Sequence, residues 1–402
     1  MSGLRVLITG ASVAGPALGL VLARSGAIVT LVERSKALRT EGQNIDIRGV
    51  GIGVIKRLGV EKAIRQHTTT EAGLVFVNSQ NEVEAEFPAQ ENDSNSPTAE
   101  IEILRGQLAQ ILYDASKDKV EYIFDNRVTS IEQNDDVAHV SFANGTPKDY
   151  DLVVAADGQT SKTRAIAFGE KADGCVHSLG QYMAYFSIPR GDTDTEMARW
   201  YNAPERRCIL LRPDNTGSTR AVLGIVSSDP ALDGVLESGV EEQRKLMRRL
   251  FDDAGWETER ILNGMDTTDD FYMQQVAQVK LPEWSVSRFC VVGDSAYCPS
   301  PISGMGTTCA LVGAYVLAGE ICKHGKDYRS AFREYDRIMR PFVERAQKLP
   351  PGGPKLLNPE TSWGISLLNT TLGVFTQSGL AKLFEKFAGS SADSMELPNY
   401  PI

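Results

Sequence analysis

The sequence predicts an α/β fold with a mostly parallel sheet built from two separate parts of the chain, an inserted mainly antiparallel β-sheet domain, and C-terminal helices. Three observations predict it. Apolar runs at residues 4–9 and 28–32 flank a helical segment, which makes one βαβ unit. Between about residues 175 and 280, β-rich stretches replace the glycine-punctuated units. After residue 288 the strand–glycine–helix pattern returns.

We therefore expect residues 1–174 and 281–349 to form the two parts of one nucleotide-binding domain. Residues 175–280 are expected to form a substrate-binding domain, and residues 350–402 a helical tail. Local patterns predict helices at 16–24, 50–58, 105–115, 240–251, 307–322, 328–348 and 363–375, where the last could pack on either domain. They predict strands at 152–155, 183–188, 208–211, 220–226 and 289–292, a hairpin of 74–77 with 83–87, a turn at Asn144-Gly145 between two strands, and an exposed loop at 88–100.

Bulk composition excludes several classes of protein. The chain has 402 residues and a formal net charge of -10, so it lacks the basic surplus that nucleic-acid binding needs. The six cysteines form no CxxC pair and no metal-like cluster with the four histidines, which predicts packed free thiols, no metal and a reducing, cytoplasmic compartment. No apolar run approaches the length of a membrane span.

The first nucleotide-binding motif is the loop Gly10-Ala11-Ser12-Val13-Ala14-Gly15, between the first strand and the first helix. Gly10 permits a tight turn, and Gly15 lets the helix pack closely on the strand. The helix N-terminus directs free N–H groups at a pyrophosphate. Ser12 stands where the usual motif has glycine, and it can still serve if its side chain points aside or donates to a phosphate oxygen. Taken alone, the loop could also be a packing turn in another α/β protein.

Glu33 ends the second strand, where an acid hydrogen-bonds an adenosine ribose. NADP would favour an arginine at that place to accept its extra phosphate, and here Arg34 comes only one residue later. The first site therefore favours FAD or NAD over NADP.

A later motif favours FAD over NAD. The strand at 289–292 delivers Asp294 to the carboxyl edge of the sheet, where a carboxylate can accept hydrogen bonds from a ribityl chain. The next loop, with Gly304 and Gly306, leads into a helix near Thr307 whose positive end suits the electron-rich edge of a flavin ring. The alternative for Asp294 is a capping carboxylate on a surface loop.

Two arginines are candidates for cofactor contacts. Arg105 begins a helix, where its charge opposes the helix dipole, so a phosphate partner explains it better than a solvated position does. Arg164 follows the Asp157-Gly158 motif and could serve the site or make a surface ion pair.

Together these motifs resemble the single-component FAD-dependent aromatic hydroxylases, the p-hydroxybenzoate hydroxylase-like flavoprotein monooxygenases. The resemblance covers residues 1 to about 345, and residues 44–48 and 293–306 look most like the tetracycline-inactivating branch. The departures are Ser12, Ser295 and Ala156, each a small residue for another. The resemblance implies that Glu33 binds the adenosine ribose, Arg34 and Arg105 lie along FAD, Asp46 lies near the flavin, Asp294 binds the ribityl and pyrophosphate region, and 157–164 handle FAD and NADPH.

The resemblance also implies the reaction: NADPH or NADH transiently reduces FAD, oxygen adds to the reduced flavin, and the hydroperoxide passes an oxygen atom to the substrate. We therefore expect a monomeric or homodimeric FAD-dependent monooxygenase that hydroxylates an aromatic or polycyclic, polyketide-like small molecule. The reductant has no domain of its own, because no second glycine-rich loop appears before Lys280. The alternatives are Baeyer–Villiger oxidation or epoxidation on the same flavin, an oxygen-independent FAD reductase, and a non-catalytic flavin-binding protein.

Three arginines and three aromatic residues are candidates to face the substrate. If the substrate is a phenol, a cation should favour its phenolate form, and Arg48, Arg199 and Arg212 are the candidates, with surface exposure as the alternative for each. Three aromatic residues could line the pocket, with core packing as the alternative: Trp200, Tyr201 and Tyr272.

Overall fold

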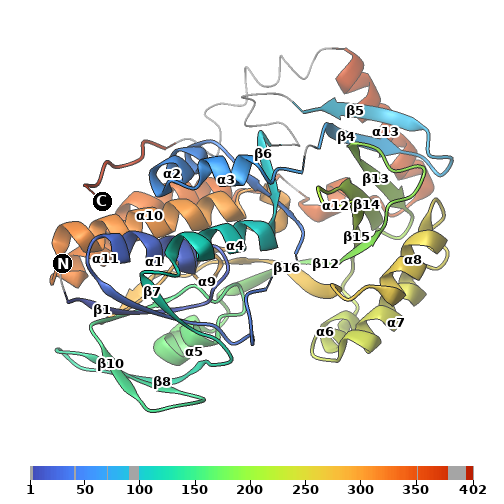
Figure 1. The fold of residues 1–402 in the computed structure, drawn as a ribbon. Helices are drawn as coiled ribbons and strands as arrows, with labels where there is room; N and C mark the ends of the chain where they lie inside the picture. The colour runs from blue at the N-terminus through green and yellow to red at the C-terminus, as the bar shows by residue number, and fades with distance from the viewer. Residues whose placement is uncertain are drawn as a thin grey trace.

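The computed structural model describes residues 3–39, 42–69, 71–89, 99–350, 352–378 and 395–401. Two sheets form the centres of two layered halves that lie side by side (Figure 1). The N-terminus and the end of the C-terminal segment both lie on the half that contains the first sheet.

The first sheet is assembled from both ends of the chain. Its strand order is β17 (Ser285–Val286), β18 (Phe289–Val291), β11 (Leu152–Ala155), β1 (Arg5–Thr9), β2 (Ile28–Val32) and β7 (Val120–Ile123), and all pairs except β17–β18 are parallel. Strands buried on both faces read as continuous apolar runs, which is why these segments could be recognised. The pairing of Val153 with Phe289 joins segments on either side of the inserted domain, as predicted.

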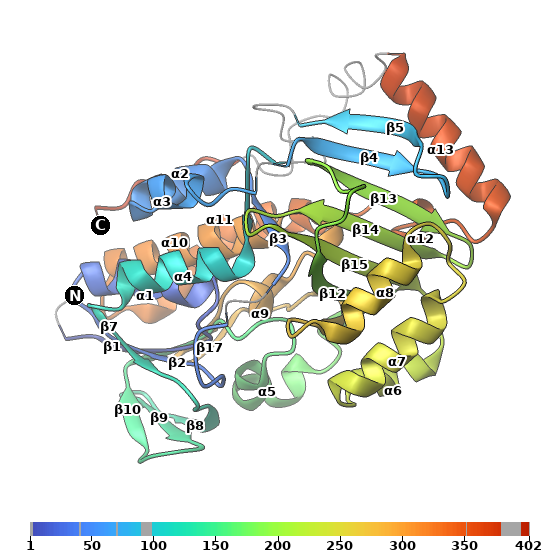
Figure 2. The same ribbon diagram turned by 45° about the vertical axis from the view of Figure 1, so that its right-hand side comes forward.

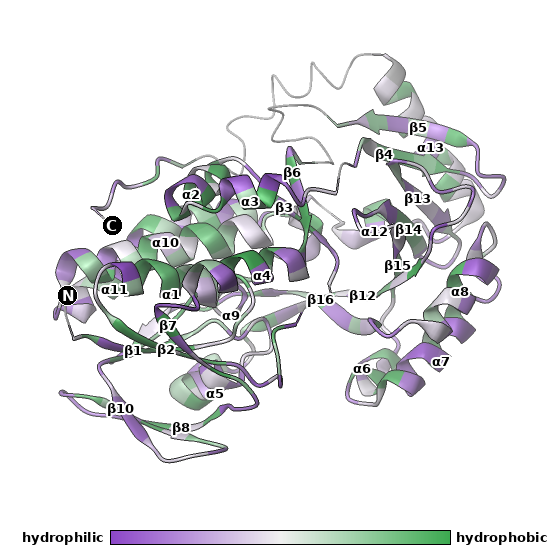
Figure 3. Cartoon of the chain, viewed as in Figure 1, coloured by the Kyte–Doolittle hydropathy of each residue, from purple (hydrophilic) through white to green (hydrophobic). Residues whose placement is uncertain are grey.

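Helices cover one face of this sheet: α1 (Ala14–Arg24), α4 (Arg105–Ser116), α10 (Gly306–His324) and α11 (Tyr328–Ala346), with α2 (Val50–Leu58) and α3 (Glu61–Arg65) beside them (Figure 2). Below it lie α5 (Lys162–Phe168), a short 3-10 turn (Gly169–Ala172) and a small antiparallel sheet of β8 (Val128–Gln133), β9 (Ala138–Phe142) and β10 (Lys148–Tyr150). Most of α10 is buried, as its small and apolar residues predict, and Figure 3 shows its hydrophobic colouring.

The second sheet has the order β16 (Tyr272–Val279), β12 (Val176–Pro189), β15 (Ser218–Val226), β14 (Arg207–Pro213), β13 (Met197–Ala203), β4 (Gly73–Val77) and β5 (Val83–Pro88). It is antiparallel except for the pair β13–β4. The predicted hairpin is present as β4–β5. The boundaries predicted from the sequence assign residues 73–88 to the first domain, whereas in the structure the hairpin extends the second sheet. A hairpin signal is local and does not say which sheet its free edge joins.

The outer face of the second sheet is covered by α6 (Pro230–Leu236), α7 (Val240–Phe251) and α8 (Thr258–Thr267), whose apolar side chains share a core with it. At its far edge α13 (Ser362–Gln377) packs on β5 and β13, so the C-terminal apolar helix belongs with this half. A two-stranded ribbon of β3 (Asn44–Ile47) and β6 (Ile101–Leu104) lies between the two halves. Most of the loop predicted at 88–100 lies outside the described residues.

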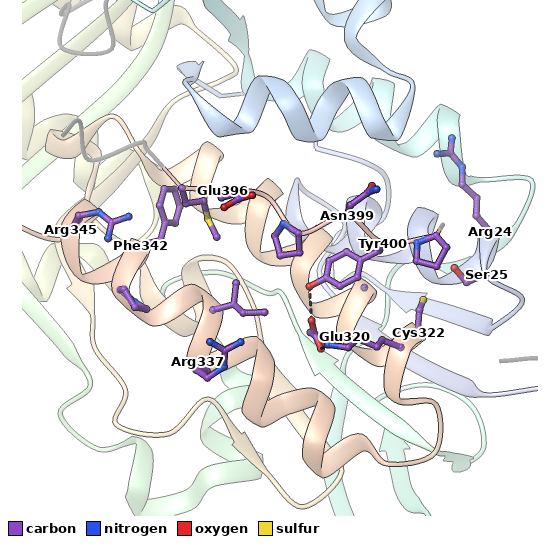
Figure 4. A pocket seen from close by; sticks show the side chains of 17 residues that line it. Arg24, Ser25, Glu320, Cys322, Arg337, Phe342, Arg345, Glu396, Asn399 and Tyr400 are labelled. Carbon is purple, nitrogen blue, oxygen red and sulfur yellow. Dashed lines mark hydrogen bonds and ion pairs between the residues drawn. The ribbon is translucent and has the colours of Figure 1, made fainter.

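The last described residues, 395–401, run across α10 and α11 beside a groove of about 940 Å³ (Figure 4). The Tyr400 ring lies over Gly319, where a Cβ would approach it to 2.1 Å. The Tyr400 hydroxyl donates to the buried carboxylate of Glu320 at 2.7 Å. None of the predicted site residues lines this groove.

Candidate functional site

One cleft of about 1400 Å³ joins the carboxyl edge of the first sheet to the inner face of the second. Ligand sites for single small molecules commonly occupy about 300–1,000 Å³, so this cleft has room for a dinucleotide and a second molecule. Nearly all the residues predicted from the sequence line it: Gly10, Ser12, Val13, Ala14, Glu33, Arg34, Asp46, Arg48, Arg105, Asp157, Arg212, Asp294, Gly304, Gly306 and Thr307.

The first loop has the geometry that its glycines predict. Gly10 has φ +100°, and a Cβ there would meet the carbonyl oxygen of Ala156 at 2.4 Å. A Cβ on Gly15 would lie 2.0 Å from the Gly10 carbonyl oxygen, which confirms the close packing of helix on strand. Glu33 accepts the backbone N–H of Ala11 at 2.9 Å, so its carboxylate is held against the loop.

The distant second motif meets this loop directly. Gly293 has φ +67°, and a Cβ there would lie 3.1 Å from the Cβ of Ala14. Asp294 starts α9 (Asp294–Tyr297), and its carboxylate faces the interior cleft, which argues against the surface-cap alternative. The surrounding protein raises the pKa of Asp294 by desolvation, and the positive charge of Arg105 opposes that rise. The two motifs therefore form one site.

The ribbon residues lie against the start of α10. Asp46 pairs with the Arg48 guanidinium at 2.7 Å, and the Arg48 backbone N–H donates to the Thr308 hydroxyl at 2.9 Å. A Cβ at Gly304 would lie 3.4 Å from an Asp46 carboxylate oxygen. The other oxygen of Asp46 is buried with no hydrogen-bond partner among the described residues.

Arg105 begins α4, as predicted, and its side chain packs against Gly42, where a Cβ would lie 3.0 Å from the Arg105 Nε. Its guanidinium makes no side-chain hydrogen bond in the described part of the chain, which fits a cation placed for a ligand phosphate.

Asp157 and Arg164 hold the turn after β11. Asp157 accepts the Thr163 hydroxyl at 2.9 Å and its backbone N–H at 3.2 Å, so it supports the start of α5 while lining the cleft. The surface-pair interpretation of Arg164 is wrong: its side chain is buried and donates at 2.9 Å to the carbonyl oxygens of Ser295 and Gln159. Arg164 ties α5 to the segment that carries Asp294.

These groups fit a long, anionic dinucleotide with an attached ring system. The N-termini of α1 and α10 open on the same cleft and supply unpaired N–H groups and positive helix ends. The glycines at 10, 304 and 306 leave bare backbone at these two loops, and Arg105 and Glu33 suit a phosphate and a ribose.

A family model described as "FAD binding domain" matches residues 3–348. The chain belongs to the FAD-dependent monooxygenases of the aromatic hydroxylase type. The resemblance seen in the sequence motifs is confirmed, and FAD is the cofactor that the family binds.

Similar proteins support the same assignment. The chain is 36% identical to "Flavin-dependent monooxygenase eupH" of Phoma sp, over 100% of this chain and 98% of that protein. It is 36% identical to "Monooxygenase CTB7" of Cercospora beticola, over 99% and 98%. The crystal structure of tetracycline destructase Tet(51) matches with a TM-score of 0.81 and 33% identity, covering 99% of this chain and 100% of that one. The protein is therefore a flavin-dependent oxidoreductase.

Klebsiella pneumoniae HpxO complexed with FAD and uric acid matches with a TM-score of 0.75 at 17% identity, which supports the fold alone. Within the described ranges, no helix combines the length and apolar character that crossing a bilayer requires. The six cysteines are free, and all but Cys322 are buried.

Side chains alternate between the two faces along β13, so the residues of this strand that were predicted to face the substrate lie on opposite faces of the sheet. Trp200 lines the cleft, whereas its neighbours in β13 point to the other face. Tyr201 packs in the core and donates to the Ala254 carbonyl oxygen at 2.8 Å. Arg199 donates to the Asn81 side chain at 2.5 Å and does not reach the cleft, so its predicted substrate role is wrong. The alternation in the sequence shows which residues share one face of the sheet, but it does not show which face borders the cleft and which packs against other elements.

Tyr272 lines the cleft as predicted. Its ring stacks on Tyr185 with centroids 4.9 Å apart, and its hydroxyl donates to the Gln43 side chain. Burial raises the pKa of Tyr272 to about 12, so its hydroxyl stays protonated. The sequence reasoning missed further lining residues, which carry no motif: Met183, Leu210, Val222, Gln274, Leu357 and Asn358.

Arg212 reaches the cleft already paired with two acids that the sequence reasoning missed. It donates to both carboxylate oxygens of Glu71, at 2.8 and 2.9 Å, and to Glu102. Burial raises the pKa of Glu102 to about 7, and the nearby charges of Glu71 and Asp46 add to the effect, while Arg212 opposes it. An acid within the apolar strand Ile101–Leu104 was the available signal.

Proposed function

We propose that this monooxygenase uses NADPH or NADH and molecular oxygen to hydroxylate an aromatic or polycyclic small molecule. The observation that carries the proposal is the continuity of the cleft, which runs from the dinucleotide loops to a sheet face bearing Tyr185, Trp200 and Tyr272. Flat aromatic side chains favour flat apolar ligands. The likeness to tetracycline destructases supports a polycyclic substrate.

Bound FAD would supply electron storage and oxygen activation, which protein side chains cannot provide. In this proposal the α1 N-terminus and Arg105 bind the pyrophosphate, Glu33 binds the ribose, and Asp294 accepts hydrogen bonds from the ribityl chain. The loop around Gly304 presents backbone N–H groups to the ring edge.

The remaining cofactor contacts and the domain roles follow from the same arrangement. Arg34, Asp46, Asp157 and the start of α10 at Gly306 and Thr307 border the cofactor part of the cleft. Residues 175–280, joined by the hairpin of β4 and β5, form the substrate-binding half, and residues 1–174 and 281–349 the cofactor-binding half. Arg48 is held by Asp46 at the junction of the two and orients substrate against the cofactor.

The substrate-binding half places the substrate and excludes water. Buried aromatic and aliphatic side chains replace solvent around the reacting ring, which protects reactive species from hydrolysis. The nicotinamide donor enters the open cleft and leaves it again, since the chain has no second glycine-rich nucleotide loop before Lys280.

The test is a screen of the purified, FAD-loaded protein against phenols, anthraquinones and polyketides. We expect a ligand of this class to stimulate oxidation of NADPH or NADH and consumption of oxygen. Labelled oxygen should appear in a hydroxylated product. Labelled ester or epoxide products would instead indicate Baeyer–Villiger oxidation or epoxidation. If no aromatic or polycyclic compound stimulates oxygen consumption or becomes labelled, the proposal fails.

A further inference from the structure

The inner face of the second sheet presents an arginine whose charge is already neutralised by neighbouring acids. Glu71, Arg212 and Glu102 form what we call the acid–arginine cluster. The side chains of Glu71 and Glu102 are 2% and 3% exposed, whereas that of Arg212 is 18% exposed and lines the cleft. Both carboxylates are thus almost fully covered, although Glu71 also borders the cleft, and the guanidinium is the part of the cluster most exposed to a ligand.

The hydrogen bonds of Arg212 leave one end of its guanidinium for that ligand. Nε and Nη2 donate to Glu71, and Nη2 also donates to Glu102. Nη1 makes no hydrogen bond with the described residues and is not fully buried. Because Arg212 lines the cleft, this nitrogen is open to it. A planar guanidinium held at two edges offers its third edge in a fixed direction.

The charges of the cluster do not sum to a positive value. With both acids ionised, two carboxylates face one guanidinium. Asn44 and Thr69 also donate to Glu102 and hold it in place. When Glu102 takes up a proton, the cluster is neutral. In neither state does it carry the net positive charge that would balance an anionic ligand.

A second arginine on the same face repeats the arrangement. Arg220 lines the cleft and pairs with Asp214 at 3.0 Å and with Asp270 at 2.7 Å. Other cations line the cleft without such pairs of acids among the described residues: Arg34, Arg39, Arg105, Arg127 and Lys162. Arg48 also lines it and pairs with Asp46. None of them lies on the strands of the second sheet that carry Arg212 and Arg220.

We propose that the acid–arginine cluster makes the enzyme select a substrate that presents an uncharged oxygen acceptor, a ketone, quinone or neutral hydroxyl, to Arg212, and reject aromatic carboxylates. This inference rests on the proposed function and names its substrate class. A neutral acceptor gains a hydrogen bond from a charged donor at little desolvation cost. A carboxylate would lose its water and meet no balancing charge.

The experiment compares two ligands that share one ring system, a hydroxynaphthyl methyl ketone and the corresponding hydroxynaphthoate. Their affinities for the FAD-loaded protein are measured by isothermal titration calorimetry without any reductant. We expect the ketone to bind at least about tenfold more tightly. Equal or tighter binding of the carboxylate, or failure of every neutral aromatic in the screening panel to bind, would overturn the proposal.

Variants test whether the acids set the preference. Glu71→Gln removes one negative charge, and we expect it to shift the affinity ratio toward the carboxylate by about tenfold. Glu257→Gln is the matched control, because Glu257 pairs with Arg260 at 2.6 Å in the same half but does not line the cleft. The ratio of ketone to carboxylate affinity in Glu257→Gln should equal that of the parent protein.

If Glu71→Gln does not fold, Glu102→Gln makes the same test within the acid–arginine cluster. An unchanged ratio in the folded variant overturns the proposal. Because binding is measured without turnover, a protein that prefers the ketone yet oxidises nothing would contradict only the proposed function. A protein that hydroxylates aromatic carboxylates as efficiently as ketones would contradict only this inference.

Discussion

A Cβ atom at Gly293 would lie 3.1 Å from the Cβ of Ala14, closer than most Cβ contacts, so the two ends of the cofactor motif pass each other at close range. The first βαβ turn and the loop that carries Asp294 can approach this closely only because position 293 has no side chain.

Gly293→Ala should therefore weaken FAD binding by about tenfold or more, since alanine would be strained at φ +67°, ψ -144° and would crowd Ala14. The flavin content of the purified protein and titration of the apoprotein with FAD measure the effect. Gly217→Ala is the control: it has φ +87° with no atom within 4 Å, so it meets backbone strain without crowding. Equal FAD affinity in both variants would contradict the assigned role of the contact.

Asp294→Lys should abolish flavin retention, because it reverses the charge of the carboxylate that faces the cleft and places two cations, Lys and Arg105, near each other. Asp294→Asn keeps the size of the side chain and should retain part of the flavin. Absorbance of the purified variants measures this. The control Asp252→Lys changes an exposed residue at the C-terminal end of α7. An Asp294→Lys protein that stays yellow at full occupancy would rule out the role.

Arg164→Met should lower the free energy of unfolding by about 3 kcal/mol, because two carbonyl oxygens lose their charged donor. Urea denaturation measures this value. Arg249→Met, at an exposed position of α7, should change it by less than about 0.5 kcal/mol. Similar losses in the two variants would show that Arg164 does not tie α5 to the Asp294 segment.

The raised pKa of Glu102 predicts a pH dependence of stability. The folded protein holds this carboxyl protonated up to about pH 7, whereas in an unfolded chain it ionises near its ordinary value of 4.5. Between these values the folded state binds more protons, so the free energy of unfolding falls as pH rises, and this contribution is constant above about pH 7. Glu102→Gln should remove this part of the slope in urea denaturation at about pH 5.5 and about pH 8. If the free energy of unfolding changes equally between these two pH values in the parent protein and in Glu102→Gln, the predicted contribution of Glu102 is contradicted.

Tyr400→Phe should destabilise the protein by about 1–3 kcal/mol, because the buried Glu320 carboxylate loses the hydrogen bond that the Tyr400 hydroxyl donates to its other oxygen, the one not paired with Lys323 and His324. Thermal unfolding of the FAD-loaded protein measures the change. The control Tyr113→Phe removes a hydroxyl that makes no hydrogen bond to the described residues. Equal melting temperatures for Tyr400→Phe and the parent would show that the C-terminal segment is not anchored by this contact.

Local pattern was enough to predict the elements that build the cofactor site. The apolar run before Gly10, the close packing at Gly15 and the strand leading to Asp294 all depend on neighbours in sequence, and the structure has them as predicted. The arrangement of these parts into one parallel sheet follows from the few ways in which βαβ units can connect.

Only the tertiary structure decided which side chains of the second sheet face the cleft. Period-two alternation groups Trp200 apart from Arg199 and Tyr201, but either group could have faced the cleft. The sequence also could not pair Arg212 with Glu71 and Glu102, which come from distant segments. Cofactor motifs are local because backbone turns and helix ends form them, whereas the substrate face depends on contacts between segments far apart in the chain.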